Sequence, residues 1–340
     1  MTPRDLLTFL TQTIPLGLPV LVVGSPGVGK SDIVAQAAQA AGATLIVSHP
    51  AVSDPTDAKG LPWIAPDQTS ARFLPFGDLA QACAATTPTV WFLDDLGQAP
   101  AAVQASFMQL LLARRVDDHV LPACVSFIAA SNRRTDRANV SGMLEPVKSR
   151  FAAIVDLEPN LEDWCAWAMT HGIAAEIVAF LRFRPELLNK FSPTADLTNS
   201  PIPRTWAHAS HLLQMALPVA VKRQAITGAI GAGAAVELFG FLEVYHELPD
   251  LDTLIADPNS GKIPTKPATL YAVVTGLAMK ATAATLAPII TYAERMAHKG
   301  HGEFAALLLR DIIRRDPSMM SQAPFVAVLR GSLGSLIHGR

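Results

Sequence analysis

Short apolar runs, rich in β-branched residues and bounded by turn residues, recur through the first half of the chain. Runs of this kind are typical of strands that are buried on both faces of a sheet. Helix-like stretches separate most of them, and this alternation predicts a parallel sheet with helices on both sides. The predicted strands cover residues 20–23, 44–47, 90–93, 125–130 and 154–157, and the predicted helices cover residues 30–41, 76–85 and 101–114.

The pattern changes after Glu158-Pro159, where the strand-like runs stop. Helical patterning begins at residues 161–164 and takes over the rest of the chain. The fold class is therefore α/β over residues 1–158, followed by an all-helical region over residues 159–340. A chain of 340 residues also exceeds one average domain, which agrees with two parts.

Smaller features are predicted within these two parts. Residues 174–191 continue the helical pattern, whereas the polar, Pro-containing segments 192–203 and 257–267 are typical of loops. The short polar centre of residues 115–122 predicts a small hairpin. Residues 53–62, with two Asp, one Lys and two Pro, predict a partly ordered loop before the next helix.

Composition limits the class of protein. Half of the residues are hydrophobic, but no run approaches the roughly 20 apolar positions of a membrane span. The start of the chain lacks the features of a signal peptide, and Cys83, Cys124 and Cys165 are too far apart to indicate a disulfide framework or a zinc site. We therefore expect a cytoplasmic protein. Lys and Arg number 27 against 29 Asp and Glu, which gives no general attraction to nucleic acid or anionic lipid.

The strongest chemical signal is a GxxxxGK[ST] match between the first predicted strand and the helix that follows it. The glycines let consecutive backbone N–H groups surround phosphate oxygens, and the helix N-terminus favours negative charge. Lys30 would reach the β and γ phosphates of ATP, and the Ser31 hydroxyl would bind Mg²⁺. A chance match to a glycine-rich turn is the alternative, and the flanking strand and helix argue against it. The predicted nucleotide-contacting residues are Gly24, Ser25, Pro26, Gly27, Val28, Gly29, Lys30, Ser31 and Asp32.

A second signal is the apolar strand of residues 90–93, which ends in two carboxylates. Asp94 would hold Mg²⁺ through a water molecule, and Asp95 would orient or deprotonate the attacking water. Acidic residues at a strand end often only cap the next helix, so it is the pairing with the phosphate-binding motif that favours the catalytic interpretation.

The strand predicted over residues 125–130 is followed by Ser131-Asn132. The Asn132 amide could help to hold the lytic water beside the γ-phosphate. An Asn after a strand is commonly just a turn residue, so this interpretation depends on the other two motifs.

Several longer segments add to these motifs, namely residues 53–62, 98–105, 130–137, 149–151 and 203–206. Together they make the chain resemble an AAA+ ATPase of the MoxR-like group. The resemblance implies a five-stranded AAA+ core, a helical lid, and a homo-oligomeric ring, usually a hexamer, with ATP at the subunit interfaces.

The resemblance also implies roles for single residues. Asn132 resembles the sensor 1 residue, and Arg204 resembles the sensor 2 arginine at the start of a lid helix. Arg150 resembles the arginine finger, which stabilises transition-state charge on the γ-phosphate of a neighbouring subunit. A surface ion pair is the alternative for Arg150. The rival candidates for the finger are Arg133, Arg134 and Arg137.

The chain departs from its relatives at two positions. Asp95 stands where a Glu is usual, and Gly97 stands where an Asn is common. The shorter carboxylate leads us to expect slow basal hydrolysis.

Two histidine pairs are spaced by three residues, which would place each pair on one helical face. His208 with His211 and His298 with His301 form these pairs. No further ligand completes a metal site, so we interpret them as surface or packing residues.

The resulting hypothesis is an enzyme that couples Mg-ATP hydrolysis to remodelling or maturation of a partner protein. The resemblance implies a client or adaptor, such as one carrying a von Willebrand factor A domain. A nucleotide-gated binding module is the first alternative, and a nucleic-acid motor or loader is the second, disfavoured by the balanced charge. We also expect residues 53–62 and Trp63 to contact the client protein.

Overall fold

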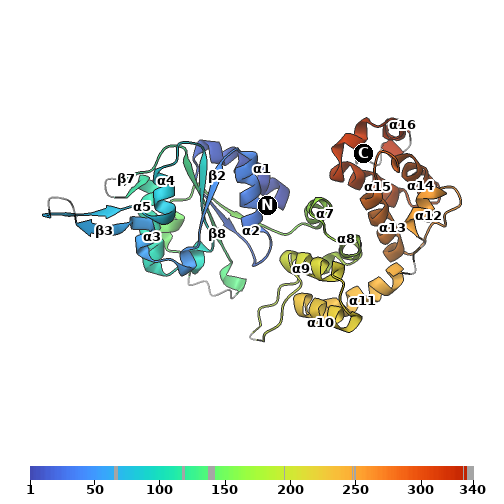
Figure 1. Ribbon diagram of the computed structural model, residues 1–340, viewed down its shortest axis with the longest axis horizontal. Coiled ribbons are helices and arrows are strands. Elements are labelled where there is room, and N and C mark those ends of the chain that lie inside the picture. Colours follow the sequence, from blue (N-terminus) through green and yellow to red (C-terminus); the bar gives the residue numbers. More distant parts are fainter. Residues whose placement is uncertain are drawn as a thin grey trace. The chain divides into compact units, whose positions relative to one another are not determined.

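The computed structural model describes residues 1–64, 68–116, 119–136, 142–194, 196–246, 248, 250–331 and 333–334. The chain divides into two compact units. The first comprises Met1–Asn160 with Ser192–Ala195, and the second comprises Leu161–Phe191 with Asp196–Arg340. Figure 1 shows a mixed α/β unit in blue to green and a helical unit in yellow to red.

A parallel five-stranded sheet forms the centre of the first unit, with strand order β2-β5-β8-β1-β9. The sheet confirms the α/β prediction and its five strands. Every residue of β5 and β8 is buried, which explains why those runs are mostly apolar. The strands are β1 (Val20–Val23), β2 (Thr44–Ser48), β5 (Thr89–Leu93), β8 (Val125–Ser131) and β9 (Ala153–Asp156).

Helices cover both faces of this sheet. Alternate strand residues face opposite sides, so Phe92 packs in the cluster of α1 and α2, whereas Trp91 packs in the cluster of α4 and α5. The helices of this unit are α1 (Pro3–Thr13), α2 (Lys30–Ala40), α3 (Pro55–Lys59), α4 (Gly77–Cys83), α5 (Ala101–Ala113) and α6 (Glu145–Lys148). Short 3₁₀ turns lie at Ile14–Leu16, Pro50–Val52, Leu96–Gln98 and Arg134–Asp136.

Two antiparallel hairpins extend the first unit. Strands β6 (Arg115–Val116) and β7 (His119–Val120) pair as the sequence predicts, although the intervening Asp117 and Asp118 lie outside the described residues. Strands β3 (Leu61–Ile64) and β4 (Ala71–Leu74) form a second hairpin that the sequence did not predict. Figure 1 shows β3 reaching away from the central sheet of its unit.

The prediction of a loop over residues 53–62 was wrong. Asp54 caps α3 by accepting a hydrogen bond from the backbone N–H of Thr56 at 2.9 Å. The Asp57 carboxylate accepts from the backbone N–H of Asp54 at 2.8 Å, which completes a reciprocal capping box. These local bonds, with Pro55 at the first helical position, stabilise one short helix before β3 begins.

The regular secondary structure among the described residues of the second unit is helical, as predicted. One boundary differs, because α8 ends at Phe183 rather than continuing through residues 174–191. Pro185 cannot continue the helix and opens a 3₁₀ turn, Pro185–Leu187. The helices are α7 (Leu161–Thr170), α8 (Ala175–Phe183), α9 (Pro203–Gln214), α10 (Val219–Ile230), α11 (Ala232–His246), α12 (Leu251–Ala256), α13 (Pro267–Lys280), α14 (Leu286–His298), α15 (Gly302–Arg315) and α16 (Ala323–Arg330), with a 3₁₀ turn at Pro317–Ser321.

A buried ion pair joins α8 to α15 inside this helical unit. The Arg182 guanidinium donates two hydrogen bonds to the Asp311 carboxylate, at 2.6 and 2.8 Å, and one to the Thr275 hydroxyl at 3.1 Å. Burial alone would lower the pKa of Arg182, but the Asp311 carboxylate outweighs it and raises that pKa. The two short, parallel hydrogen bonds are the geometry of a charge-assisted pair, in which each ion depends on the other for compensation.

Candidate functional site

The loop between β1 and α2 has the backbone shape that a phosphate-binding loop needs. Gly27 and Gly29 have φ values of 71° and 100°, in the left-handed region that glycine adopts without steric cost. Gly29 is also the N-cap of α2, so the free N–H groups of the first helical turn point toward the loop. The backbone N–H of Gly24 donates to the carbonyl of Ser131 at 3.2 Å, which ties the loop to the end of β8.

Lys30 lies inside this loop and is 7% exposed. Its Nζ donates to the carbonyl oxygens of Gly24 and Ser25 at 2.7 and 3.0 Å, and to Asn132 Oδ1 at 2.7 Å. The ammonium group is thereby held between the loop and the end of β8.

The next residue, Ser31, reaches the end of β5. Its hydroxyl donates to Asp94 Oδ2 at 2.7 Å. A hydroxyl beside a carboxylate is the set of hard oxygen donors that Mg²⁺ prefers, so these two residues fit a magnesium site. The backbone N–H of Asp94 donates to the carbonyl of Ser48 at 2.9 Å, which holds the end of β5 against the end of β2.

Asp95 adopts a left-handed backbone conformation, with φ 58° and ψ 32°. Asp tolerates this region better than most residues, which suits a position where the chain turns sharply after β5. The turn brings Asp95 Oδ1 to 3.4 Å from Asn132 Nδ2, a long hydrogen bond. Lys30, Ser31, Asp94, Asp95 and Asn132 therefore meet at the carboxyl end of the sheet.

The remaining residues of the loop differ in exposure. Val28 packs in the core with α2, Gly24 and Ser25 are buried, and Pro26 is half-buried. Asp32 is exposed in the first turn of α2, where its charge interacts favourably with the helix dipole.

Arg150 lies just after α6. Its Nε donates to the carbonyl of Met108 at 3.1 Å, and its Nη1 donates to the carbonyl of Pro146. The neighbouring Phe151 packs with α5, in the cluster on the face of the sheet opposite α2.

The rival arginines have different surroundings. Arg133 pairs with Asp156, the last residue of β9, at 3.4 Å, and with Glu158 in the segment that follows. Partial burial lowers the pKa of Arg133, but these carboxylates outweigh it and raise that pKa. Arg134 is exposed, and Arg137 lies outside the described residues.

Arg204 is exposed in the first turn of α9, within the second unit. His208 and His211 are also exposed on α9. The prediction that His298 and His301 share a helical face was wrong, because α14 ends at His298 and His301 is the N-cap of α15.

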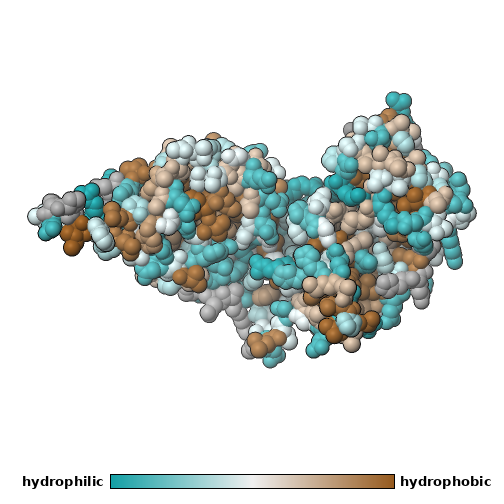
Figure 2. Space-filling view, in the orientation of Figure 1, coloured by the Kyte–Doolittle hydropathy of each residue, from teal (hydrophilic) through white to brown (hydrophobic). Residues whose placement is uncertain are grey.

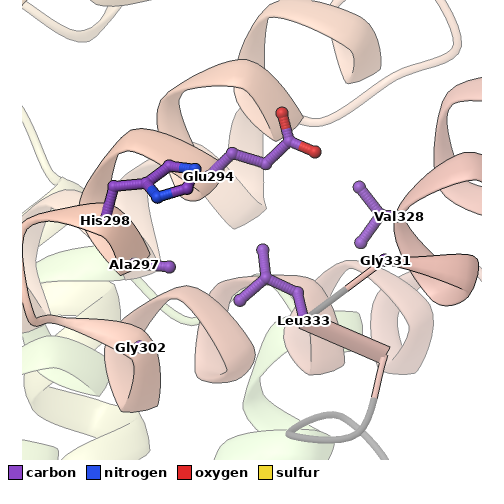
Figure 3. A pocket seen from close by; sticks show the side chains of 7 residues that line it. All are labelled: Glu294, Ala297, His298, Gly302, Val328, Gly331 and Leu333. Atoms are coloured by element: carbon purple, nitrogen blue, oxygen red, sulfur yellow. The ribbon is translucent and has the colours of Figure 1, made fainter.

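His298 instead lines a cavity of about 290 Å³ in the second unit. Figure 3 shows Glu294 and His298 side by side on one helix, with Val328 and Leu333 across the cavity. Neither polar side chain is buried, and none of the residues predicted to bind nucleotide lines this cavity.

The β3–β4 hairpin presents apolar side chains to solvent. Trp63 and Ile64 are each 66% exposed, and Leu61 and Leu74 are also exposed. Figure 2 shows hydrophobic residues at this end of the first unit. Trp63 is therefore a surface residue of the hairpin rather than part of the core.

Two polar residues near the site were not assigned a role from the sequence. Ser48 accepts from Trp91 Nε1 at 2.8 Å and donates to Asp78 Oδ2 at 2.5 Å. Gln104 is buried on α5 and bonds to three backbone groups. Polar residues at core positions of an apolar helix or strand are the sequence signal that could have marked them.

Residues 19–151 match the family model of the AAA domain, dynein-related subfamily. With the five-stranded parallel sheet and the glycine loop between β1 and α2, this match defines the first unit as an AAA domain with the P-loop NTPase fold. The family model does not extend to the helical unit. No match was found among curated proteins.

Several solved structures resemble the chain. NtrX from Brucella abortus is 12% identical, with 98% of this chain and 67% of that chain covered and a TM-score of 0.42. The Thermotoga maritima RuvB Holliday junction branch migration motor is 16% identical, with 88% and 87% covered and a TM-score of 0.41. A putative ATPase from Cytophaga hutchinsonii is 18% identical, with 46% and 44% covered and a TM-score of 0.31.

None of the described helices combines the length and the apolar character that crossing a membrane requires.

Proposed function

We propose that the chain is a Mg²⁺-dependent ATPase of the MoxR-like AAA+ group, which works as a homo-oligomeric ring, a hexamer, and remodels or matures a partner protein. The observation that carries this proposal is the meeting of the P-loop with the ends of β5 and β8. Lys30 lies 2.7 Å from Asn132, and Ser31 lies 2.7 Å from Asp94.

Each of these residues has a role in phosphoryl transfer. Lys30 neutralises charge on the β and γ phosphates, and the backbone N–H groups at the start of α2 bind phosphate oxygens. Ser31 and Asp94 would hold Mg²⁺, which neutralises phosphate charge when bound. Asp95 orients the attacking water and accepts its proton, and Asn132 keeps both Lys30 and Asp95 in place through its amide.

The proposal extends to residues outside this cluster. Arg150 acts on the nucleotide of a neighbouring subunit, and Arg204 acts from the helical unit, which serves as a lid. The partner is a protein, and one carrying a von Willebrand factor A domain is the first candidate. The exposed apolar hairpin, with Trp63 and Ile64, supports a protein-binding role for the first unit.

ATP turnover tests the proposal directly. Phosphate release should require Mg²⁺, and Asp94→Asn should lower it on the order of a hundredfold, because the metal loses the carboxylate that holds it. Asp252→Asn, an exposed carboxylate on α12 paired with Lys280, is the matched control and should leave turnover unchanged. Turnover that is the same with EDTA as with Mg²⁺ would contradict the assignment.

The alternative of a nucleotide-gated binding module is tested by adding candidate clients. Stimulated turnover indicates remodelling, whereas client binding that depends on ATP but not on hydrolysis indicates a gated module. A filter-binding titration across salt concentrations tests the nucleic-acid motor.

A further inference from the structure

Gln104 is a buried residue near the start of α5, and it is 1% exposed. Its Nε2 donates to the carbonyls of Ala99 and Gly142, each at 3.0 Å. Its Oε1 accepts from the backbone N–H of Leu144, also at 3.0 Å. Both amide hydrogens and the amide oxygen are therefore used, and all three partners are backbone groups.

These bonds connect two parts of the proposed machinery. Ala99 follows the 3₁₀ turn Leu96–Gln98, whose N-cap is Asp95, and the N–H of Gln98 donates to the Asp95 carbonyl at 2.9 Å. Leu144 is the N-cap of α6, the short helix that precedes Arg150. Gln104 thus joins the turn after Asp95 to the start of the segment that carries Arg150.

Helix α5 also holds the other end of that segment. Met108, whose carbonyl accepts from Arg150 Nε at 3.1 Å, lies four residues after Gln104 and therefore on the same face of α5. Between these two contacts, Val147 packs in the same apolar cluster as Val103 and Phe107. The segment from Gly142 to Phe151 is held against α5 at its start, middle and end.

We propose that Gln104 is a positioning residue for Arg150. It fixes the start of α6 relative to the turn after Asp95. The Arg150 guanidinium thereby keeps its position along the axis of α5. This inference rests on the proposed role of Arg150 as the arginine that acts across the subunit interface.

The test compares Gln104→Met with Arg150→Ala. Met has a similar length to Gln but cannot make the three hydrogen bonds. The start of α6 should therefore shift relative to α5. A displacement of about 1 Å of a group that contacts the transition state lowers turnover on the order of a hundredfold. We expect Gln104→Met to lower turnover by tenfold to a hundredfold, without changing the affinity for a fluorescent ATP analogue.

Ser106→Ala is the matched control. Ser106 is buried on the same helix, but its hydroxyl donates only to the carbonyl of Val103 within α5, at 2.6 Å. Its replacement should leave turnover close to the parental value. An equal loss in Ser106→Ala and Gln104→Met would show a general effect on α5 and overturn the inference.

Mixed rings separate a positioning role from a structural one. Subunits with Gln104→Met keep an intact P-loop, and subunits with Lys30→Ala keep an intact Arg150. Mixing these two impaired proteins should restore part of the turnover, as should mixing Arg150→Ala with Lys30→Ala. The inference would be overturned if the mixture rescued Arg150→Ala but not Gln104→Met. Parental turnover of Gln104→Met would also overturn it, and neither outcome would affect the role proposed for Arg150. Parental turnover of Arg150→Ala would instead overturn the role proposed for that arginine.

A second variant covers the case in which Gln104→Met does not fold. Gln104→Glu keeps an acceptor for Leu144 N–H but loses both donated hydrogen bonds. We expect it to lower turnover in the parental background and to cause no further loss when Arg150 is already Ala, because both changes act through the same group. Independent, multiplicative losses would contradict the inference.

Discussion

Lys30 Nζ donates a 2.7 Å hydrogen bond to Asn132 Oδ1, although 102 residues separate the two in the chain. The contact exists because β1 and β8 are parallel neighbours in the sheet, with Val23 opposite Ser131. Their carboxyl ends therefore lie together, and the residues that follow them meet. The same bond orients the Asn132 amide, so that its Nδ2 is directed toward Asp95.

Replacement of Lys30 tests the P-loop. Lys30→Ala removes the ammonium group that is held among the loop carbonyls and that would bind the β and γ phosphates. A hydrogen bond to a charged group contributes about 1.5–3 kcal/mol. We expect ATP affinity, measured by calorimetry, to fall by at least tenfold. Lys299→Ala, an exposed lysine after α14, is the control and should bind ATP as the parent does. Unchanged affinity in Lys30→Ala would disprove the assignment of the loop.

Two substitutions of Asp95 test its role. Asp95→Asn keeps the shape of the side chain and tolerates the left-handed backbone, but removes the charge and basicity. We expect turnover to fall on the order of a hundredfold or more while ATP stays bound. Asp95→Glu adds one bond of about 1.5 Å to the side chain, which places the carboxylate about 1.3 Å closer to the water. We expect basal turnover to rise.

The outcome for Asp95→Asn separates catalysis from a local structural role. Turnover near the parental rate, with ATP binding retained, would reduce Asp95 to the N-cap of the 3₁₀ turn Leu96–Gln98. Single-turnover phosphate release distinguishes this result from slow product release.

The exposed hairpin is tested with Trp63→Ala. Trp63 is 66% exposed on β3, so its replacement should leave basal turnover within about twofold and reduce client-stimulated turnover about tenfold or more, as for an aromatic residue central to an interface. Val236→Ala, on an exposed apolar side chain of α11, is the matched control. Equal loss of basal and stimulated turnover would argue against a client contact.

The buried ion pair makes a prediction about stability. Asp311→Asn leaves the Arg182 guanidinium charged and buried without its counter-ion, which destabilises a protein by about 3–5 kcal/mol. Glu243→Gln, which removes the exposed partner of Arg223, should cost less than about 1 kcal/mol. Urea unfolding followed by far-UV circular dichroism compares the two, because the second unit is helical. Equal midpoints would show that the buried pair adds no more than the exposed one.

Much of the fold follows from local sequence patterns. The five sheet strands were predicted from short, mostly apolar runs, and this pattern is strongest in β5 and β8, whose residues are all buried. The hairpin of β3 and β4 was missed for the opposite reason. None of its residues is buried, so burial imposes no pattern on them, and Pro62 within β3 argues against a strand.

The sequence by itself determined the P-loop and the carboxylates after β5, because the phosphate-binding turn is made by consecutive residues and its glycines are required by the backbone. Only the tertiary structure decided which distant groups meet them. Asn132 reaches Lys30 through strand order, and Gln104 reaches Leu144 across 40 residues through the packing of α5 against α6. Such contacts depend on which surfaces pack together, and local propensity does not encode that choice.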